Sequence, residues 1–168
     1  GSVALSVDDD TPAPVDTAIN TNDNSTTAVA GTLTANVGAD SANTSYALLE
    51  PGTDNTNGIS YSLDSSNKTL TVNQGGSAVM TIALDAATGD YTVTQTAAIT
   101  HLAGADSLEL NISYTVTDSD GDSAQGTMTI TASDGIPTVT SSNNTAITLD
   151  DDDVAGGNND NATGDDTA

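Results

Sequence analysis

Residues 107–116 have the sequence SLELNISYTV, and this stretch decides the fold class. Every even position from Leu108 to Val116 carries a large apolar side chain, and every odd position from Ser107 to Thr115 carries a polar or charged one. Successive side chains of a β-strand point to opposite faces of the sheet, so strict alternation is typical of a strand that buries one face. The stretch predicts a long, half-buried β-strand.

Shorter alternating runs occur along the rest of the chain. The clearest contain Met80, Ile82 and Leu84 in one run and Met128 and Ile130 in another. Further candidate strands are Leu33–Val37, Ile59–Leu63, Leu70–Val72 and Tyr91–Val93. Turns rich in glycine, asparagine and aspartate separate the runs, and no long segment has the 3.6-residue spacing of an amphipathic helix. Seven or more short strands with one apolar face predict an all-β, antiparallel β-sandwich.

The charge balance of the chain is extreme. It has one lysine, no arginine, two glutamates and 22 aspartates, which gives a formal net charge of −23 at pH 7. Such a chain cannot neutralise phosphate groups, which argues against nucleic acid and anionic membrane surfaces as partners. Ca²⁺ is the expected cofactor because it prefers carboxylate and carbonyl oxygen ligands. No stretch approaches the ~20 apolar residues of a membrane-spanning helix, so direct membrane insertion is not expected.

The composition also limits the core. Hydrophobic residues make up 35% of the chain, and phenylalanine, tryptophan and cysteine are absent. The core must therefore consist mainly of valine, isoleucine, leucine and alanine, without a disulfide. A cation that binds only the folded state adds about 2.7 kcal/mol per site at a concentration about 100-fold above its Kd. We expect a marginally stable domain in the absence of Ca²⁺.

The segment Asp118-Ser119-Asp120-Gly121-Asp122 places three carboxylates at alternate positions of a glycine-containing turn. This spacing lets several oxygens converge on one ion, as in the first half of an EF-hand loop. The glutamate at the twelfth position and the flanking helices of an EF-hand are missing. We predict a Ca²⁺ site in this turn, and the alternative is a solvated hairpin turn.

The position of this turn in a sandwich suggests further ligands. In a seven-stranded sandwich the turn before the last strand lies at the end where the chain enters, next to the acidic linker that precedes Pro12. The candidate ligands at this N-terminal junction are Asp8, Asp9, Asp10, Asp40, Asp118, Asp120 and Asp122. The candidates at the C-terminal junction, shared with a following unit, are Asp134, Asp150, Asp151, Asp152 and Asp153. Acidic runs are also common in solvated linkers, which is the alternative for the last four.

The two ends of the chain contain related segments. Residues 3–7 alternate and are followed by an acidic turn and Pro12, as residues 128–132 are followed by Asp134 and Pro137. This repetition predicts a tandem array. We expect residues 1–12 to hold a cloning remnant (Gly1-Ser2) and the end of a preceding repeat with its linker. Residues 13–137 would form one immunoglobulin-like repeat domain, and residues 138–168 a partly disordered linker and the start of the next repeat.

Several segments carry a resemblance to a known family. They are residues 31–40, 83–93, 99–101 and, most clearly, YTVTDSDGDSA at 114–124 with the following strand and Asp134 to Pro137. In this order they resemble the repeats of RTX adhesins and other giant substrates of type I secretion. The resemblance covers nearly the whole central unit and implies an immunoglobulin-like fold with calcium at the junctions. It also implies a role as an extender or as part of the distal ligand-binding region. Some relatives carry an inserted sugar-binding domain, and the lack of such an insertion favours a scaffold role.

The expected function is therefore that of a calcium-binding structural domain, an extender or scaffold, in a large secreted adhesin at the bacterial cell surface. Such an adhesin would serve attachment or biofilm formation, with neighbouring repeats as direct partners and a host or surface ligand bound through other domains. The alternative is a recognition module for carbohydrate or a surface protein.

Catalysis is not expected. His101 is the only histidine, and without cysteine it makes a poor zinc site, so a structural role is predicted. Thr92, Thr94 and Thr96 could form a flat array that binds ice or carbohydrate, but threonine is also common on the solvent face of strands.

Overall fold

The computed structural model describes residues 1–4, 10–22, 25–39, 41–52 and 57–135. These residues form eleven β-strands and no helix, which confirms the predicted all-β class. In this described part of the chain, no helix is long and apolar enough to cross a membrane. The strands lie in one compact unit that ends at Ile136.

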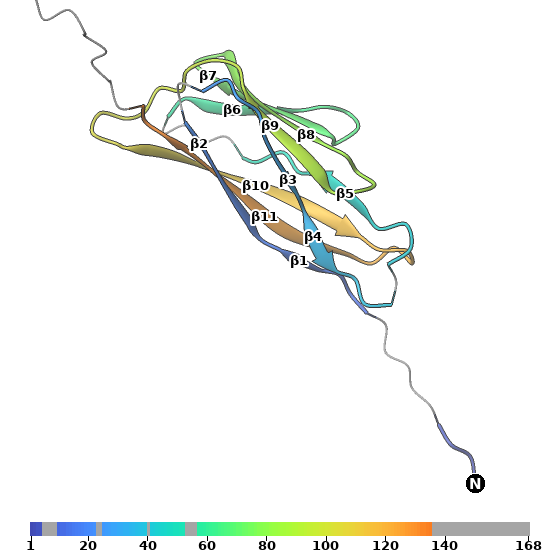
Figure 1. Cartoon of the computed structure of the whole chain (residues 1–168). Coiled ribbons are helices and arrows are strands. Elements are labelled where there is room, and N and C mark those ends of the chain that lie inside the picture. The colour runs from blue at the N-terminus through green and yellow to red at the C-terminus, as the bar shows by residue number, and fades with distance from the viewer. Residues whose placement is uncertain (5–9, 23–24, 40, 53–56, 136–168) are drawn as a thin grey trace, which may run out of the picture. The chain divides into compact units, whose positions relative to one another are not determined.

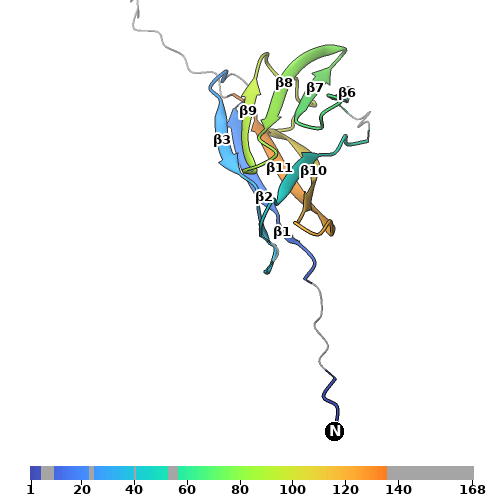
Figure 2. The same ribbon diagram turned by 90° about the vertical axis from the view of Figure 1, so that its right-hand side faces the viewer.

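The strands form two main sheets that face each other as a sandwich (Figures 1 and 2). The four-stranded sheet has the order β2 (Thr17–Asn22), β11 (Ser123–Ser133), β10 (Ser107–Thr117) and β5 (Ser45–Leu48). The five-stranded sheet has the order β3 (Val29–Thr32), β9 (Asp90–Gln95), β8 (Ser77–Leu84), β7 (Thr69–Gln74) and β6 (Ile59–Leu63). A separate pair joins β1 (Ala13–Val15) to β4 (Thr34–Asn36). The architecture is that of an immunoglobulin-like sandwich, as predicted.

Strand direction separates one pair from the others. Every described strand pair is antiparallel except β2 with β11, which is parallel over six residues. In chain order, β2 is the first strand of the two main sheets, and it therefore runs alongside β11, the last strand.

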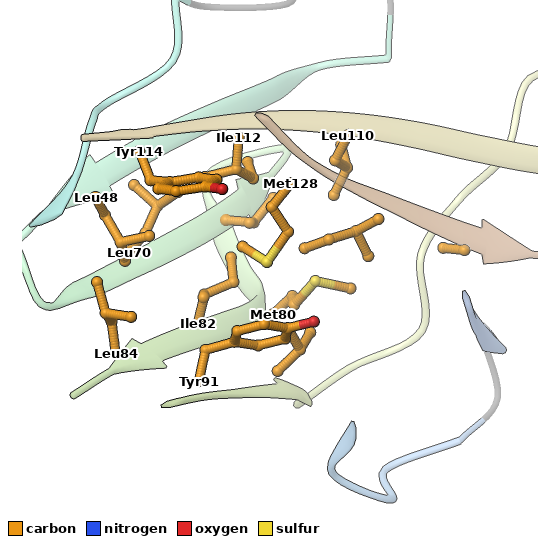
Figure 3. Close-up of a cluster of buried hydrophobic side chains, with 14 of the residues drawn as sticks. Leu48, Leu70, Met80, Ile82, Leu84, Tyr91, Leu110, Ile112, Tyr114 and Met128 are labelled. Atoms are coloured by element: carbon orange, nitrogen blue, oxygen red, sulfur yellow. The ribbon is translucent and has the colours of Figure 1, made fainter. Parts of the chain in front are cut away.

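The core lies between the sheets and follows the alternation seen in the sequence. In β10 the even positions from Leu108 to Val116 are buried, and the facing positions of β11 from Met128 to Ala132 are buried as well. Figure 3 shows Ile112, Tyr114 and Met128 above the side chains that the other sheet contributes, among them Ile82 and Tyr91. Two methionines and two tyrosines supply the volume that phenylalanine and tryptophan provide in other cores.

Each of the two buried tyrosines faces a glycine. Tyr114 is the register partner of Gly126, and Tyr91 is that of Gly31. An added Cβ at Gly126 would come within 2.6 Å of the Tyr114 ring and 2.8 Å of Pro14. Because glycine has no side chain, these two positions leave the space in which the tyrosine rings lie.

The N-terminal third differs most from expectation. The run Leu33–Val37 was predicted as one strand, but Leu33 lies between β3 and β4, where its N–H donates to the Gly89 carbonyl at 2.8 Å. Leu33, Ala35 and Val37 still contact the core, so the predicted inward face is correct. Strands β1, β2, β3 and β5 were not predicted. Residues 1–4 form no strand, and Val3 is 95% exposed.

Candidate metal centre

Asp118 continues the buried face of β10 into the following turn. The inward positions of the strand end at Val116, and Asp118 occupies the next position of the same period. Its side chain is consequently only 4% exposed, although the turn around it is largely open to solvent. The alternation that builds the core thus places a carboxylate at one end of it.

One oxygen of this carboxylate holds the turn closed. Asp118 Oδ1 accepts hydrogen bonds from the N–H groups of Gly121 at 3.2 Å and Asp122 at 2.9 Å. The N–H of Asp118 donates to the Asp122 carbonyl at 3.0 Å. Gly121 has φ of 107°, a backbone conformation that favours glycine. The turn is therefore fixed by its own backbone and by one of the two oxygens.

The second oxygen has no such partner. Asp118 Oδ2 is buried and accepts no hydrogen bond from the residues that the structure describes. Burial raises the pKa of Asp118 above its ordinary value, and the negative charge of the neighbouring Asp120 carboxylate raises it further. A buried carboxylate beside a second carboxylate requires either a proton or a cation.

Other acidic turns of the sandwich differ from this one. In the β6–β7 turn, Asp64 Oδ1 accepts from the N–H groups of Lys68 at 2.8 Å and Thr69 at 2.9 Å, and Oδ2 accepts from the Ser66 hydroxyl. These bonds lower the pKa of Asp64 from 3.8 to about 2, the Ser66 hydroxyl having the largest effect. Asp64 is satisfied by its own turn, whereas Asp118 has an oxygen left for a ligand.

The chain enters the sandwich at the end that holds this turn (Figure 1). Pro14 of β1 lies against Gly126, close to the start of β11, and Asp16 Oδ1 accepts from the N–H of Thr127 at 2.8 Å. Asp10, three residues before β1, is exposed, and its carboxylate lies against Gly38. Gly38 has φ of 58°, so the Asp10 carboxylate covers a site where a Cβ is absent. The structure thus brings Asp10 to the turn after β4.

The remaining predicted ligands divide into two groups. Asp134 is exposed at the opposite end of the sandwich, where its N–H donates to the Asp106 carbonyl at 2.9 Å. The others lie outside the described residues, namely Asp8, Asp9, Asp40, Asp150, Asp151, Asp152 and Asp153. Among the residues that are described, no three acidic, histidine or cysteine side chains form a group that could hold a metal ion. The geometry provides a carboxylate pair at Asp118 and Asp120, not a complete ligand set.

His101 lies near the far end of the sandwich from this turn. Its Nε2 lies 3.0 Å from the Ala132 carbonyl, which connects the loop before β10 to β11. The loop borders an open groove of about 490 Å³. Gln74 in this groove donates to the Asn57 and Thr100 carbonyls and accepts from the Thr100 N–H at 2.7 Å. The glutamine side chain joins two loops, a role that the sequence did not indicate.

The threonine array is only partly formed. Thr94 of β9 is the register partner of Thr81, which pairs with Thr71 of β7. Thr96 lies beyond the end of β9, and its hydroxyl donates to the Ala78 carbonyl at 3.3 Å. The row on the sheet therefore runs across strands through Thr71, Thr81 and Thr94, and Thr96 lies outside the strand that contains Thr92 and Thr94.

Comparison with known proteins gives a family. No curated protein matches the chain. Residues 5–131, which include every strand up to most of β11, match the sequence model of a family described as "Domain of unknown function (DUF5801)". The chain therefore belongs to the DUF5801 family.

Proposed function

We propose that this domain is a calcium-binding structural unit, an extender or scaffold, in a large secreted adhesin of the bacterial cell surface. The observation that supports calcium binding best is the buried Oδ2 of Asp118, which accepts no hydrogen bond within the described residues. The adhesin setting, with attachment or biofilm formation as its purpose, rests on the resemblance of residues 31–40 and 114–124 to RTX adhesin repeats.

The chemistry of the turn favours calcium as the cation. Ca²⁺ binds six to eight oxygens at flexible geometry, from carboxylates, backbone carbonyls and water. Asp118 Oδ2 and the Asp120 carboxylate would supply the charged ligands, and Asp122 is the next acidic side chain of the turn. Further oxygens would come from backbone, water or the candidate residues Asp8, Asp9 and Asp40. When bound, the ion supplies positive charge that offsets the repulsion between the carboxylates.

The distribution of charge supports a role at the ends of the domain. Among the aspartates in the described ranges, only Asp90 belongs to a strand, as the first residue of β9. The others lie in turns and in segments between strands, so the negative charge gathers at the ends of strands, and Asp10, Asp118, Asp120 and Asp122 lie at the end where the chain enters. Cations at such positions would reduce self-repulsion and restrict the angle between consecutive repeats.

The test is the response of stability and size to calcium. We expect the Tm of the chain to rise and its scattering profile to become more compact in millimolar Ca²⁺ than in excess EDTA. At a free concentration about 100-fold above Kd, one site adds about 2.7 kcal/mol to the free energy of unfolding. The double variant Asp118→Asn, Asp120→Asn should lose most of this calcium-dependent gain.

A matched control separates a site from general charge. Asp85 also closes a turn, but its Oδ1 accepts from the N–H groups of Ala87 at 2.9 Å and Thr88 at 3.3 Å. Asp85→Asn removes one negative charge and should leave the calcium response intact. Equal responses from the parent chain and the Asp118, Asp120 double variant would refute the proposed site.

A further inference from the structure

The parallel pair of β2 and β11 determines how the domain carries force. The two strands lie side by side and run in the same direction (Figure 1). Thr17 at the start of β2 is the register partner of Met128, and Asn22 at its end is the partner of Ser133. The chain therefore enters this pair at one end of the sandwich and leaves β11 at the other.

Tension between the two ends of the domain would act along these strands. A pull on the segment before β1 draws β2 toward the N-terminal end, and a pull beyond Ser133 draws β11 the opposite way. The hydrogen bonds of the pair lie across the strands, so this load must displace all of them together. By contrast, a pull that separates the two strands from one end breaks the same hydrogen bonds one after another and therefore needs a lower force.

Several contacts fasten the start of this load path to the sandwich. The Tyr114 hydroxyl donates to the Val15 carbonyl at 2.8 Å, and Thr127 N–H donates to Asp16 Oδ1 at 2.8 Å. Strand β1 also pairs with β4 over three residues. Farther along, Ile19 of β2 packs against the core beside its register partner Ile130. Force applied before β1 thus reaches β4, β10 and β11 before β2 can slide.

We infer that Thr17–Asn22 of β2 and Met128–Ser133 of β11 form a shear clamp that makes the domain a force-bearing link when it is pulled through its two ends. The physiological load rests on the proposed function in an adhesin, where a cell held at a surface would pull on each repeat. The clamp itself is a property of the fold and requires no metal ion.

Single-molecule pulling on one chain from two directions tests this inference. The chain contains no cysteine, so two introduced cysteines give unique attachment points. Thr11→Cys with Gly135→Cys loads the clamp along the strands, from before β1 to after β11. Thr11→Cys with Ser123→Cys applies force at the starts of β1 and β11, which lie at the same end, and peels the strands apart. Thr11 and Ser123 are exposed.

The result is the ratio of the two unfolding forces at one loading rate. Forced unfolding is governed by the barrier along the pulling direction, so we expect a force roughly twofold or more higher for the 11–135 attachment than for the 11–123 attachment. Equal forces, or a higher force for 11–123, would overturn the clamp. The Tm of both variants should match that of the parent, because the comparison concerns direction and not stability.

Calcium separates this inference from the proposed function. Both attachments are measured in Ca²⁺ and in EDTA, and the force ratio should exceed one in both conditions. A calcium response of Tm without a directional force ratio would leave the calcium site standing and remove the clamp. A directional force ratio without any calcium response of Tm would support the clamp and remove the calcium site.

Discussion

Asp118 and Asp64 have the same side chain and each directly follows a β-strand, yet the fold shifts their pKa values in opposite directions. Asp64 lies in an exposed turn whose N–H and hydroxyl groups surround its carboxylate. Asp118 falls on the inward period of β10, where burial opposes its charge and Asp120 adds repulsion. Position relative to the strand period, and not the number of nearby acidic residues, decides which carboxylate needs a proton or a cation.

The lowered pKa of Asp64 makes a contribution to stability that depends on pH. A folded-state pKa below the unfolded value stabilises the folded state above pH 3.8, and this contribution is lost as pH falls toward about 2. We expect Asp64→Asn to be less stable than the parent chain at about pH 6 and the difference to vanish near the folded pKa. Urea unfolding of both proteins across this range measures it. A difference that stays constant with pH would show that the charge of Asp64 contributes nothing.

At the scale of elements, the junction between β1, β10 and β11 depends on one glycine. Gly126 lies opposite Tyr114, with the Tyr114 ring and Pro14 at the positions that a Cβ would contact. Neither neighbour is the free end of a flexible side chain. The Tyr114 ring is buried and its hydroxyl donates to the Val15 carbonyl, and Pro14 has a rigid ring. The packing of β1 on the four-stranded sheet therefore requires glycine at this point.

Gly126→Ala should accordingly destabilise the domain by about 1–3 kcal/mol, because the Tyr114 ring or Pro14 must move. Gly52→Ala is the matched control, since a Cβ at Gly52 meets no atom within 4 Å. Chemical denaturation of both variants gives the comparison. If Gly126→Ala matched the control, the close approach of the tyrosine ring would not matter for stability.

The elements also differ in how far the sequence predicted them. Strands β8, β10 and β11 were predicted because large apolar residues alternate with polar or small ones along them, so the sequence shows which face is buried and which is exposed. Strand β2 was missed because it is an edge strand, in which only Ile19 is a large apolar residue. Its parallel pairing with β11 joins residues more than a hundred positions apart, and no local pattern encodes such a register.

The turn that carries the candidate site was predicted to a similar extent, and its metal ligands remain a prediction. The spacing of Asp118, Asp120 and Asp122 identified the turn, and the topology places the start of β1 at the same end of the sandwich. The burial of Asp118 could have been derived by extending the period of β10 by one more step. The unequal use of its two oxygens depends on the backbone of the turn, which residue types alone do not determine.

At the scale of the whole molecule, a charge of −23 allows two distinct responses to ions, and the proposed function predicts both. Dissolved salt screens repulsion between exposed carboxylates over a distance of about 10 Å at 0.1 M, and this response rises gradually without saturation at a site. A bound cation acts at low concentration and saturates. Both raise stability, so a rise in Tm with CaCl₂ alone does not distinguish them.

Comparison at equal ionic strength does distinguish them. We expect NaCl to raise Tm gradually and CaCl₂ in the millimolar range to raise it much further at the same ionic strength, because in the proposed function only calcium would bind the Asp118 turn. Asp118→Asn should keep the NaCl response, since it removes only one of 22 aspartates, and should lose most of the additional calcium response. Differential scanning calorimetry of both proteins in matched salts measures this. Coincident NaCl and CaCl₂ curves for the parent chain would mean that screening alone accounts for the effect of calcium, and the aspartates would then serve solubility and not the junction between domains.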